Sequence, residues 1–142
     1  MQKRRILLVD DEPAIIKIVG KRLELAGYEV VVAMDGEEAL AKARLGRHEA
    51  LVLDLMLPKR NGLEVCAELK QDPKTRHIPI IIFTGKGKEM DETLCRECGA
   101  DAYITKSPNT RELLEQVETL LARALLTIEQ QPSADASSTT PT

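Results

Sequence analysis

The sequence predicts an α/β domain in which a five-stranded parallel sheet is covered by helices on both faces. Short apolar runs alternate with longer amphipathic stretches along most of the chain. Several of these runs are apolar at consecutive positions, as in parallel strands that are buried on both faces. The 142 residues, 43% hydrophobic and 30% charged, are enough for one globular domain with a sizeable core.

Each predicted element has its own local signals. We expect strands at residues 4–9, 28–33, 50–54, 78–83 and 101–105, and helices at 13–26, 36–46, 62–71, 88–98 and 108–126. Pro13 suits the first turn of a helix, and Gly27 suits a helix C-cap. The helix at 88–98 has a thin apolar stripe, whereas the last helix places its leucines on one face at helical spacing.

Consecutive βα units restrict the topology, because their crossovers are right-handed. For five strands the common solution is the flavodoxin-like (βα)5 fold, with strand order 2-1-3-4-5. We predict one domain over residues 1–128. Residues 129–142 are rich in Ser, Thr, Pro and Ala without an apolar run, so we expect a disordered C-terminal tail.

Charge and leader signals bear on partners and compartment. The formal net charge of −3 gives no general attraction to nucleic acid or to anionic membranes. The apolar stretch after the basic start is too short for a signal peptide or a membrane span. We therefore expect a cytoplasmic protein with free thiols that neither binds DNA directly nor inserts into a membrane.

The cysteines and histidines give weaker signals. Cys95 and Cys98 form a C-x-x-C pair, which suggests a redox or zinc site. We favour two incidental thiols, because only one such pair exists and it lies late in a predicted helix. Cys66 reads as a core residue at helical spacing, and His48 and His77 are expected to be exposed in polar loops.

Three carboxylates are expected to converge at one end of the sheet. In this topology ligands bind beyond the carboxyl ends of the strands, where the strand order reverses. Asp10 and Asp11 follow the first strand, and Asp54 follows the third. Clustered carboxylates take up protons or bind a cation, and an all-oxygen site with an open side favours Mg²⁺. On its own the Asp10-Asp11 pair could simply cap the following helix.

Two further strand ends supply groups that suit a phosphoryl ligand. Thr84 ends the fourth strand and can donate from its hydroxyl, and Lys106 follows the fifth strand. A carboxylate nucleophile beside a metal, a hydroxyl and a lysine suits phosphoryl transfer onto Asp54, giving an acyl phosphate. Alternatively, Thr84 could be an ordinary strand residue and Lys106 an ordinary surface lysine.

Four segments carry a family resemblance. In order along the chain they are ILLVDDEP, LVLDLMLPKRNG, IPIIIFTG and DAYITK. Over roughly residues 4–126 the chain resembles the receiver domain of two-component response regulators. The resemblance implies that Asp54 is phosphorylated and that Asp11, Asp54 and the backbone carbonyl of Met56 bind Mg²⁺. It implies that Asp10 acts through a metal-bound water.

The same resemblance implies roles for residues around the acidic cluster. Thr84 and Lys106 look like the pair that senses the phosphoryl group, and Tyr103 looks like the switch aromatic. Met56 and Lys86 occupy positions that set the lifetime of the phosphoryl group.

The sequence departs from the family pattern after Lys106. Family members usually have Pro there, often after a cis peptide bond, whereas this chain has Ser107. A cis bond before a residue other than proline costs about 2.5–4 kcal/mol. The sequence leaves both the cis and the trans form open at this bond.

The function that follows is a phosphorylation-dependent signalling switch. Asp54 would accept a phosphoryl group from a histidine kinase or phosphotransfer protein, with Mg²⁺. The chain would catalyse only its own phosphorylation and dephosphorylation. Output would run through protein–protein contact, and the fold allows a dimer through the helix at 88–98, the strand at 101–105 and the helix at 108–126.

Two alternatives remain open from the sequence. A phosphorylation-independent interaction module on the same fold is kept open by the Lys106-Ser107 departure. An aspartate-dependent phosphatase is less consistent with the sequence, because such enzymes need a D-x-D pattern and residue 12 is Glu after an adjacent aspartate pair.

Overall fold

Five parallel strands form a single sheet in the computed structural model, which describes residues 3–85, 93, 96–106 and 110–130, with 124–130 described by their backbone. The strands are β1 (Arg5–Val9), β2 (Glu29–Ala33), β3 (Ala50–Leu53), β4 (Ile80–Thr84) and β5 (Ala102–Thr105). Their order across the sheet is β2-β1-β3-β4-β5. The predicted flavodoxin-like topology is confirmed.

The helices are α1 (Pro13–Leu25), α2 (Gly36–Leu45), α3 (Gly62–Gln71) and α5 (Arg111–Gln130). The predicted helix at 88–98 lies mostly outside the described residues; residues 93, 96 and 97 of it are helical. α5 runs to Gln130, beyond the predicted 126, because residues 124–130 contain good helix formers and no Gly or Pro. Residues 129 and 130, expected in the tail, are therefore helical, and the rest of the tail lies outside the described residues.

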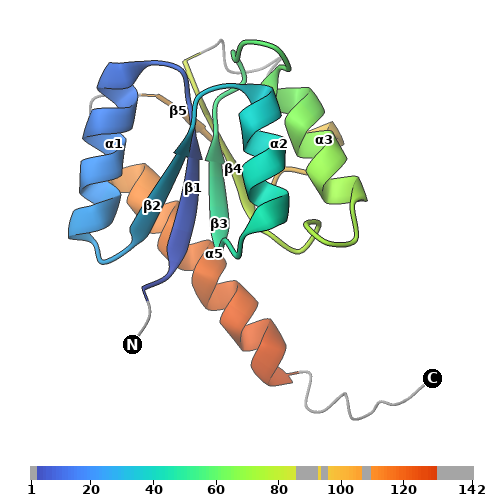
Figure 1. Ribbon diagram of the computed structural model, residues 1–142. Helices are drawn as coiled ribbons and strands as arrows, with labels where there is room; N and C mark the ends of the chain where they lie inside the picture. The colour runs from blue at the N-terminus through green and yellow to red at the C-terminus, as the bar shows by residue number, and fades with distance from the viewer. Residues whose placement is uncertain (1–2, 86–92, 94–95, 107–109, 131–142) are drawn as a thin grey trace.

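The helices cover the two faces of the sheet in pairs. α1 and α5 lie on one face, and α2 and α3 lie on the other (Figure 1). Each face has its own core. Leu7, Leu51 and Ile82 point toward α2 and α3, whereas Val52 and Ile81 point toward α1 and α5. This alternation explains the consecutive apolar residues of the central strands, since both faces of those strands are buried.

His48 is buried, which corrects the expectation that it is exposed. Its side chain is only 7% exposed, and Nε2 lies 3.0 Å from the carbonyl oxygen of Lys42. Nδ1 is buried without a hydrogen-bond partner among the described residues. The ring lies near Arg5 of β1, a neighbour from a distant part of the sequence that local polarity does not reveal. His77 is exposed, as expected.

We predict that His48 makes the fold sensitive to mild acid. Burial lowers the pKa of His48 below its ordinary value of 6.5, and the nearby Arg5 lowers the pKa further. The unfolded chain then binds a proton that the folded chain resists. Stability is therefore fully present above pH 6.5 and is lost as pH falls below that value. In urea unfolding, the free energy of unfolding of His48→Gln is expected to fall less than that of the wild type between neutral and mildly acidic pH.

The matched control for this prediction is His77→Gln, which changes an exposed histidine. That variant should follow the wild-type pH profile. A His48→Gln profile that also coincides with the wild type would show that His48 is not the group responsible.

Candidate functional site

The ends of β1 and β3 bring three carboxylates together. The backbone amide of Asp10 donates to the carbonyl oxygen of Ala33, and that of Asp54 donates to Val9, each at 3.0 Å. These bonds continue the parallel ladder past the strand ends and hold both residues side by side. Ligand oxygens of Asp10, Asp11 and Asp54 all lie within 4.8 Å of one another. The cluster predicted from the sequence therefore lies at the ends of β1 and β3, where the strand order reverses.

Lys106 extends from the end of β5 into this cluster. Its Nζ lies 2.9 Å from Asp10 Oδ2 and 3.3 Å from Asp54 Oδ2. It also lies 3.0 Å from Glu12 Oε1. The backbone amide of Lys106 donates to the carbonyl oxygen of Thr84 at 2.8 Å, which fixes where the side chain begins. One ammonium group thus contacts three carboxylates and offsets only part of their negative charge.

Burial and neighbouring charges shift the proton affinities of this cluster. Asp10 and Asp54 are 1% and 4% exposed. Burial raises the pKa of Asp54, and the nearby Asp10 adds to the rise, while Lys106 partly opposes it. Burial alone would lower the pKa of Lys106, but hydrogen bonds to Asp10 and Glu12 outweigh burial and raise it. Lys106 is therefore firmly cationic, and the site still has excess negative charge.

The predicted sensing residues flank this cluster at the same end of the sheet. Thr84 is fully buried at the end of β4 and pairs in register with Thr105 of β5. Tyr103 lies in β5, half-buried against the core cluster on the α2–α3 face.

The remaining predicted positions lie at or beyond the rim. The Met56 side chain is exposed, and its backbone amide donates a hydrogen bond to the Asp54 carboxylate. Lys86, predicted to affect phosphoryl lifetime, is outside the described residues. Ser107 is also outside them, so the structure does not describe the Lys106–Ser107 peptide bond.

Gly62 fixes the loop that leaves Asp54. The Gly62 amide donates to the carbonyl oxygen of Leu55 at 2.9 Å. A Cβ atom at this position would overlap the carbonyl oxygen of Asp54 and approach the Cα atom of Leu55 to 2.8 Å. The start of α3 can therefore pack against the Asp54 backbone only because residue 62 lacks a side chain.

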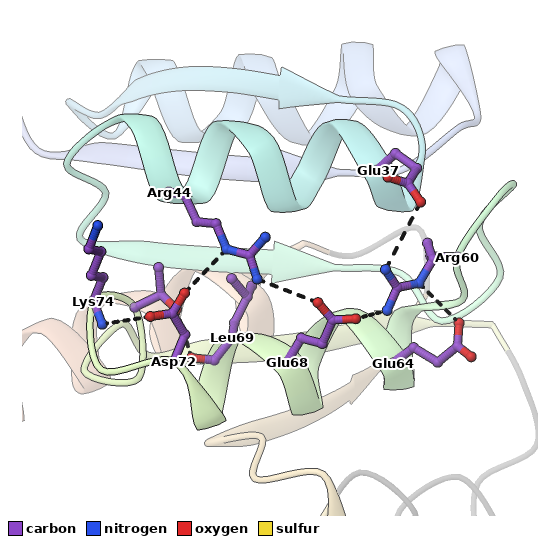
Figure 2. Close-up of polar contacts among 9 residues, drawn as sticks. Glu37, Arg44, Arg60, Glu64, Glu68, Leu69, Asp72 and Lys74 are labelled. Carbon is purple, nitrogen blue, oxygen red and sulfur yellow. Dashed lines mark hydrogen bonds and ion pairs between the residues drawn. The ribbon is translucent and has the colours of Figure 1, made fainter.

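An ion-pair network holds the same loop against α2 and α3 (Figure 2). Arg60 pairs with Glu68 and with Glu64, the latter with 3.5 Å between Nε and Oε1. Farther along the helices, Arg44 Nε lies 3.2 Å from Asp72 Oδ2, and Arg44 Nη2 lies 3.4 Å from Glu68 Oε1. Exposed pairs contribute little stability one by one. Their effect here is geometric, because Arg60 belongs to the loop that carries Met56.

The donor set at this site fits a small hard cation. Among the described residues the group contains carboxylate oxygens and neither His nor Cys. Asp11 is exposed, whereas Asp10 and Asp54 are buried, so one side of the group faces solvent. Mg²⁺ prefers a few carboxylates together with water or phosphate oxygens on an open side. Asp10, Asp11 and Asp54 are the side chains that would hold it.

Two residues of this site are not predicted from the sequence. Glu12 contacts Lys106, although its sequence context indicates only a departure from a phosphatase pattern. Its position directly after an acidic pair is the available signal. Gly62 reads in the sequence only as the start of a helix, and no signal in one sequence distinguishes a close-packing glycine from an ordinary one.

The chain matches a known family along most of its length. The family model of the response regulator receiver domain matches residues 6–118. The chain belongs to this family. Among solved structures, a CheY-like receiver domain protein from Methanospirillum hungatei JF-1 superposes with a TM-score of 0.82 at 32% identity, covering 89% of this chain and 99% of that one. The receiver identification predicted from the four sequence segments is confirmed.

Two other solved receivers bear on the metal. The response regulator TrrA from Thermotoga maritima, solved in complex with Mg²⁺-BeF, has a TM-score of 0.75 at 38% identity, covering 82% of this chain and 98% of that one. The receiver domain of the sensor histidine kinase PA1611 from Pseudomonas aeruginosa PAO1 has a magnesium ion in its active site cleft. Its TM-score is 0.79 at 27% identity, covering 85% of this chain and 99% of that one.

Curated relatives of this receiver are longer proteins. The alkaline phosphatase synthesis transcriptional regulatory protein PhoP of Bacillus subtilis is 44% identical over 85% of this chain and 50% of its own length. The transcriptional regulatory protein CpxR of Klebsiella pneumoniae is 40% identical over 96% of this chain and 56% of its own length. The chain thus spans about half the length of the curated relatives it matches. Within its described residues, no helix is both long and apolar enough to cross a membrane.

Proposed function

We propose that this receiver is a phosphorylation switch that accepts a phosphoryl group on Asp54 from a histidine kinase or phosphotransfer protein, with Mg²⁺. The observation that carries the proposal is the position of Asp54. It is buried at a strand end, within 4.8 Å of two other aspartates and 3.3 Å from the ammonium group of Lys106. A buried carboxylate with this excess of negative charge is poised for a cation and for a phosphoryl group.

The chemistry requires little movement of the acceptor. An Asp54 oxygen attacks phosphorus, and a P–O bond forms as the P–N bond to the donor imidazole breaks. Bound at the aspartates, Mg²⁺ supplies positive charge for the phosphoryl oxygens. Lys106 can leave Glu12, which is exposed, and pair with a phosphoryl oxygen at the same place. The chain then catalyses only its own phosphorylation and dephosphorylation.

The switch itself would begin at Thr84. Its hydroxyl stands at the end of β4, next to the strand that carries Tyr103. A hydrogen bond from this hydroxyl to the phosphoryl group would favour a conformation in which Tyr103 turns inward. Phosphorylation then shifts a population between two states.

The output of this unit is proposed to be protein–protein contact, including a dimer through the β5–α5 side. The names of the curated relatives describe transcriptional regulators, one of them the DNA-binding regulator RpaA of Synechocystis. Since the chain covers about half of those proteins, their DNA-related activity is not transferred to it. We propose a cytoplasmic location, a reducing compartment in which cysteines such as Cys66 and Cys98 are kept as thiols.

The acceptor role is tested by intact-protein mass spectrometry with a small phosphodonor such as acetyl phosphate. With Mg²⁺ we expect one phosphoryl adduct on the wild type and none on Asp54→Asn. Chelation of the metal should lower the rate of adduct formation by at least about a hundredfold, the scale of a lost electrostatic contact to the transferring group.

Asp72→Asn is the matched control, because Asp72 follows α3 at the other end of that helix from Asp54. It should be phosphorylated like the wild type. If the wild type forms no adduct with small donors or with a phosphorylated histidine protein, the phosphorylation-independent module becomes the better description.

A further inference from the structure

Two thiols from distant parts of the chain meet between α3 and the segment before β5. Cys66 lies in the middle of α3 and is fully buried, whereas Cys98 is partly exposed. The Cys66 thiol donates a hydrogen bond to the carbonyl oxygen of Cys98, with 3.5 Å between sulfur and oxygen. Cys98 packs against the core cluster that contains Cys66. The phosphorylation site uses neither residue.

The surroundings of Cys98 favour its thiolate. A hydrogen bond from the side chain of Cys66 lowers the pKa of Cys98 to about 7, against the opposing effect of burial. The backbone amide of Ala100 and the charge of Lys70 act in the same direction. Lys70 is itself held in place, with Nζ 2.8 Å from Asp101 Oδ2 and from the Ile78 carbonyl oxygen. A partly exposed thiolate beside a cation is the form of cysteine that reacts with peroxides.

We propose that Cys66 and Cys98 are a redox modification site, and that a hydroperoxide converts them to a reversible disulfide. The thiolate of Cys98 attacks one peroxide oxygen, the O–O bond breaks, and a sulfenic acid forms while the leaving oxygen takes a proton. The sulfur of Cys66 then attacks the sulfur of Cys98. The S–S bond forms, the S–O bond breaks, and water leaves with the Cys66 proton. Two thiols thus supply the two electrons that reduce the peroxide.

This pairing differs from the C-x-x-C pair in the sequence. Cys95, the other member of that pair, is outside the described residues. Cys66 is 32 positions from Cys98 along the chain, yet its sulfur touches the Cys98 backbone. A bond between them would link α3 to the segment that leads into β5. It would therefore add a covalent link between two parts of the fold that already meet through packing and through the Lys70–Asp101 ion pair.

The experiment is a disulfide map of the full chain. The protein is treated with hydrogen peroxide, its free thiols are blocked with iodoacetamide, and it is digested with trypsin. The sequence places each cysteine in a separate tryptic peptide: NGLEVCAELK (61–70), EMDETLCR (89–96) and ECGADAYITK (97–106). We expect the first and third to be joined, lighter by two hydrogen atoms than their sum and separated by dithiothreitol. The second should be alkylated.

Two variants complete the test. Cys95→Ser should keep the link between the first and third peptides, whereas Cys66→Ser should lose it and leave Cys98 oxidised to sulfinic acid. A link between the second and third peptides, links found only in the dimer fraction, or full alkylation of all three peptides after peroxide would each overturn the proposal. The wild-type map alone distinguishes these outcomes, even where Cys66→Ser folds poorly.

Discussion

Gly62→Ala is expected to lower the free energy of unfolding by about 3 kcal/mol, the upper part of the usual range for overpacking, because the contacted atoms cannot move aside. The added Cβ would overlap the carbonyl oxygen of Asp54 and lie 2.8 Å from the Cα atom of Leu55. Both atoms are backbone, so no change of rotamer relieves the contact. Either α3 or the end of β3 must shift. Urea unfolding monitored by circular dichroism measures this loss.

The same substitution should impair phosphorylation, because the displaced backbone is that of the acceptor. A shift of this size at a reacting group costs about tenfold to a hundredfold in rate. The rate of adduct formation from acetyl phosphate, measured at a temperature where the variant is folded, tests this second effect.

Gly20→Ala is the matched control for Gly62→Ala. Gly20 is a buried helical glycine of α1, and a Cβ atom there would lie 4.0 Å from Leu8 Cδ2, an ordinary contact. Alanine in a helix interior is favoured over glycine by about 1 kcal/mol, so this variant should be equally or more stable than the wild type. If the two variants behave alike, the close approach at Gly62 does not limit the fold.

The parts of the fold that sequence predicts well are those set by short-range patterns. The apolar runs gave the strands, and strand order followed from the number of βα units. Asp10, Asp11 and Asp54 could be placed together because each follows a strand, and strand ends in a parallel sheet share one edge. This inference needs topology but no side-chain conformation.

What sequence could not predict depends on contacts between elements that only packing brings together. Examples are the burial of His48, the contact of Glu12 with Lys106 and the contact of Cys66 with Cys98. The C-x-x-C spacing suggests a redox or zinc site at Cys95 and Cys98, although we favour two incidental thiols from the sequence; the proximity of Cys66 to Cys98 is not predicted. Spacing along the chain is a poor guide to which cysteines meet, because the fold brings together residues that a helix and a strand separate in the sequence.

Lys106→Met is expected to destabilise the metal-free protein by about 3 kcal/mol at pH 7, the lower end of the range for removing one partner of a buried ion pair. The Lys106 side chain is 14% exposed and lies 2.9 Å from Asp10 and 3.3 Å from Asp54. Methionine keeps most of the side-chain volume, so the loss reflects charge. Chemical unfolding in the presence of a chelator measures it.

Mg²⁺ and acid should each restore part of the free energy of unfolding that Lys106→Met loses. A cation bound among the carboxylates replaces the missing positive charge, so Mg²⁺ should stabilise Lys106→Met more than the wild type. Burial already raises the pKa of Asp54, and removal of the ammonium raises it further. A carboxyl whose pKa is raised by folding favours the folded state as pH falls, so the difference from wild type should shrink toward pH 5.

Lys59→Met separates this effect from the loss of any lysine. Lys59 Nζ lies 3.6 Å from Asp35 Oδ2, but the lysine side chain is 63% exposed. An exposed pair of this kind contributes little, so the variant should unfold like the wild type with or without Mg²⁺. If Lys106→Met also unfolds like the wild type and gains nothing from Mg²⁺, then Lys106 does not balance the charge of the aspartates. The position of Lys106 beside Asp54 would then need an explanation other than a role in sensing the phosphoryl group.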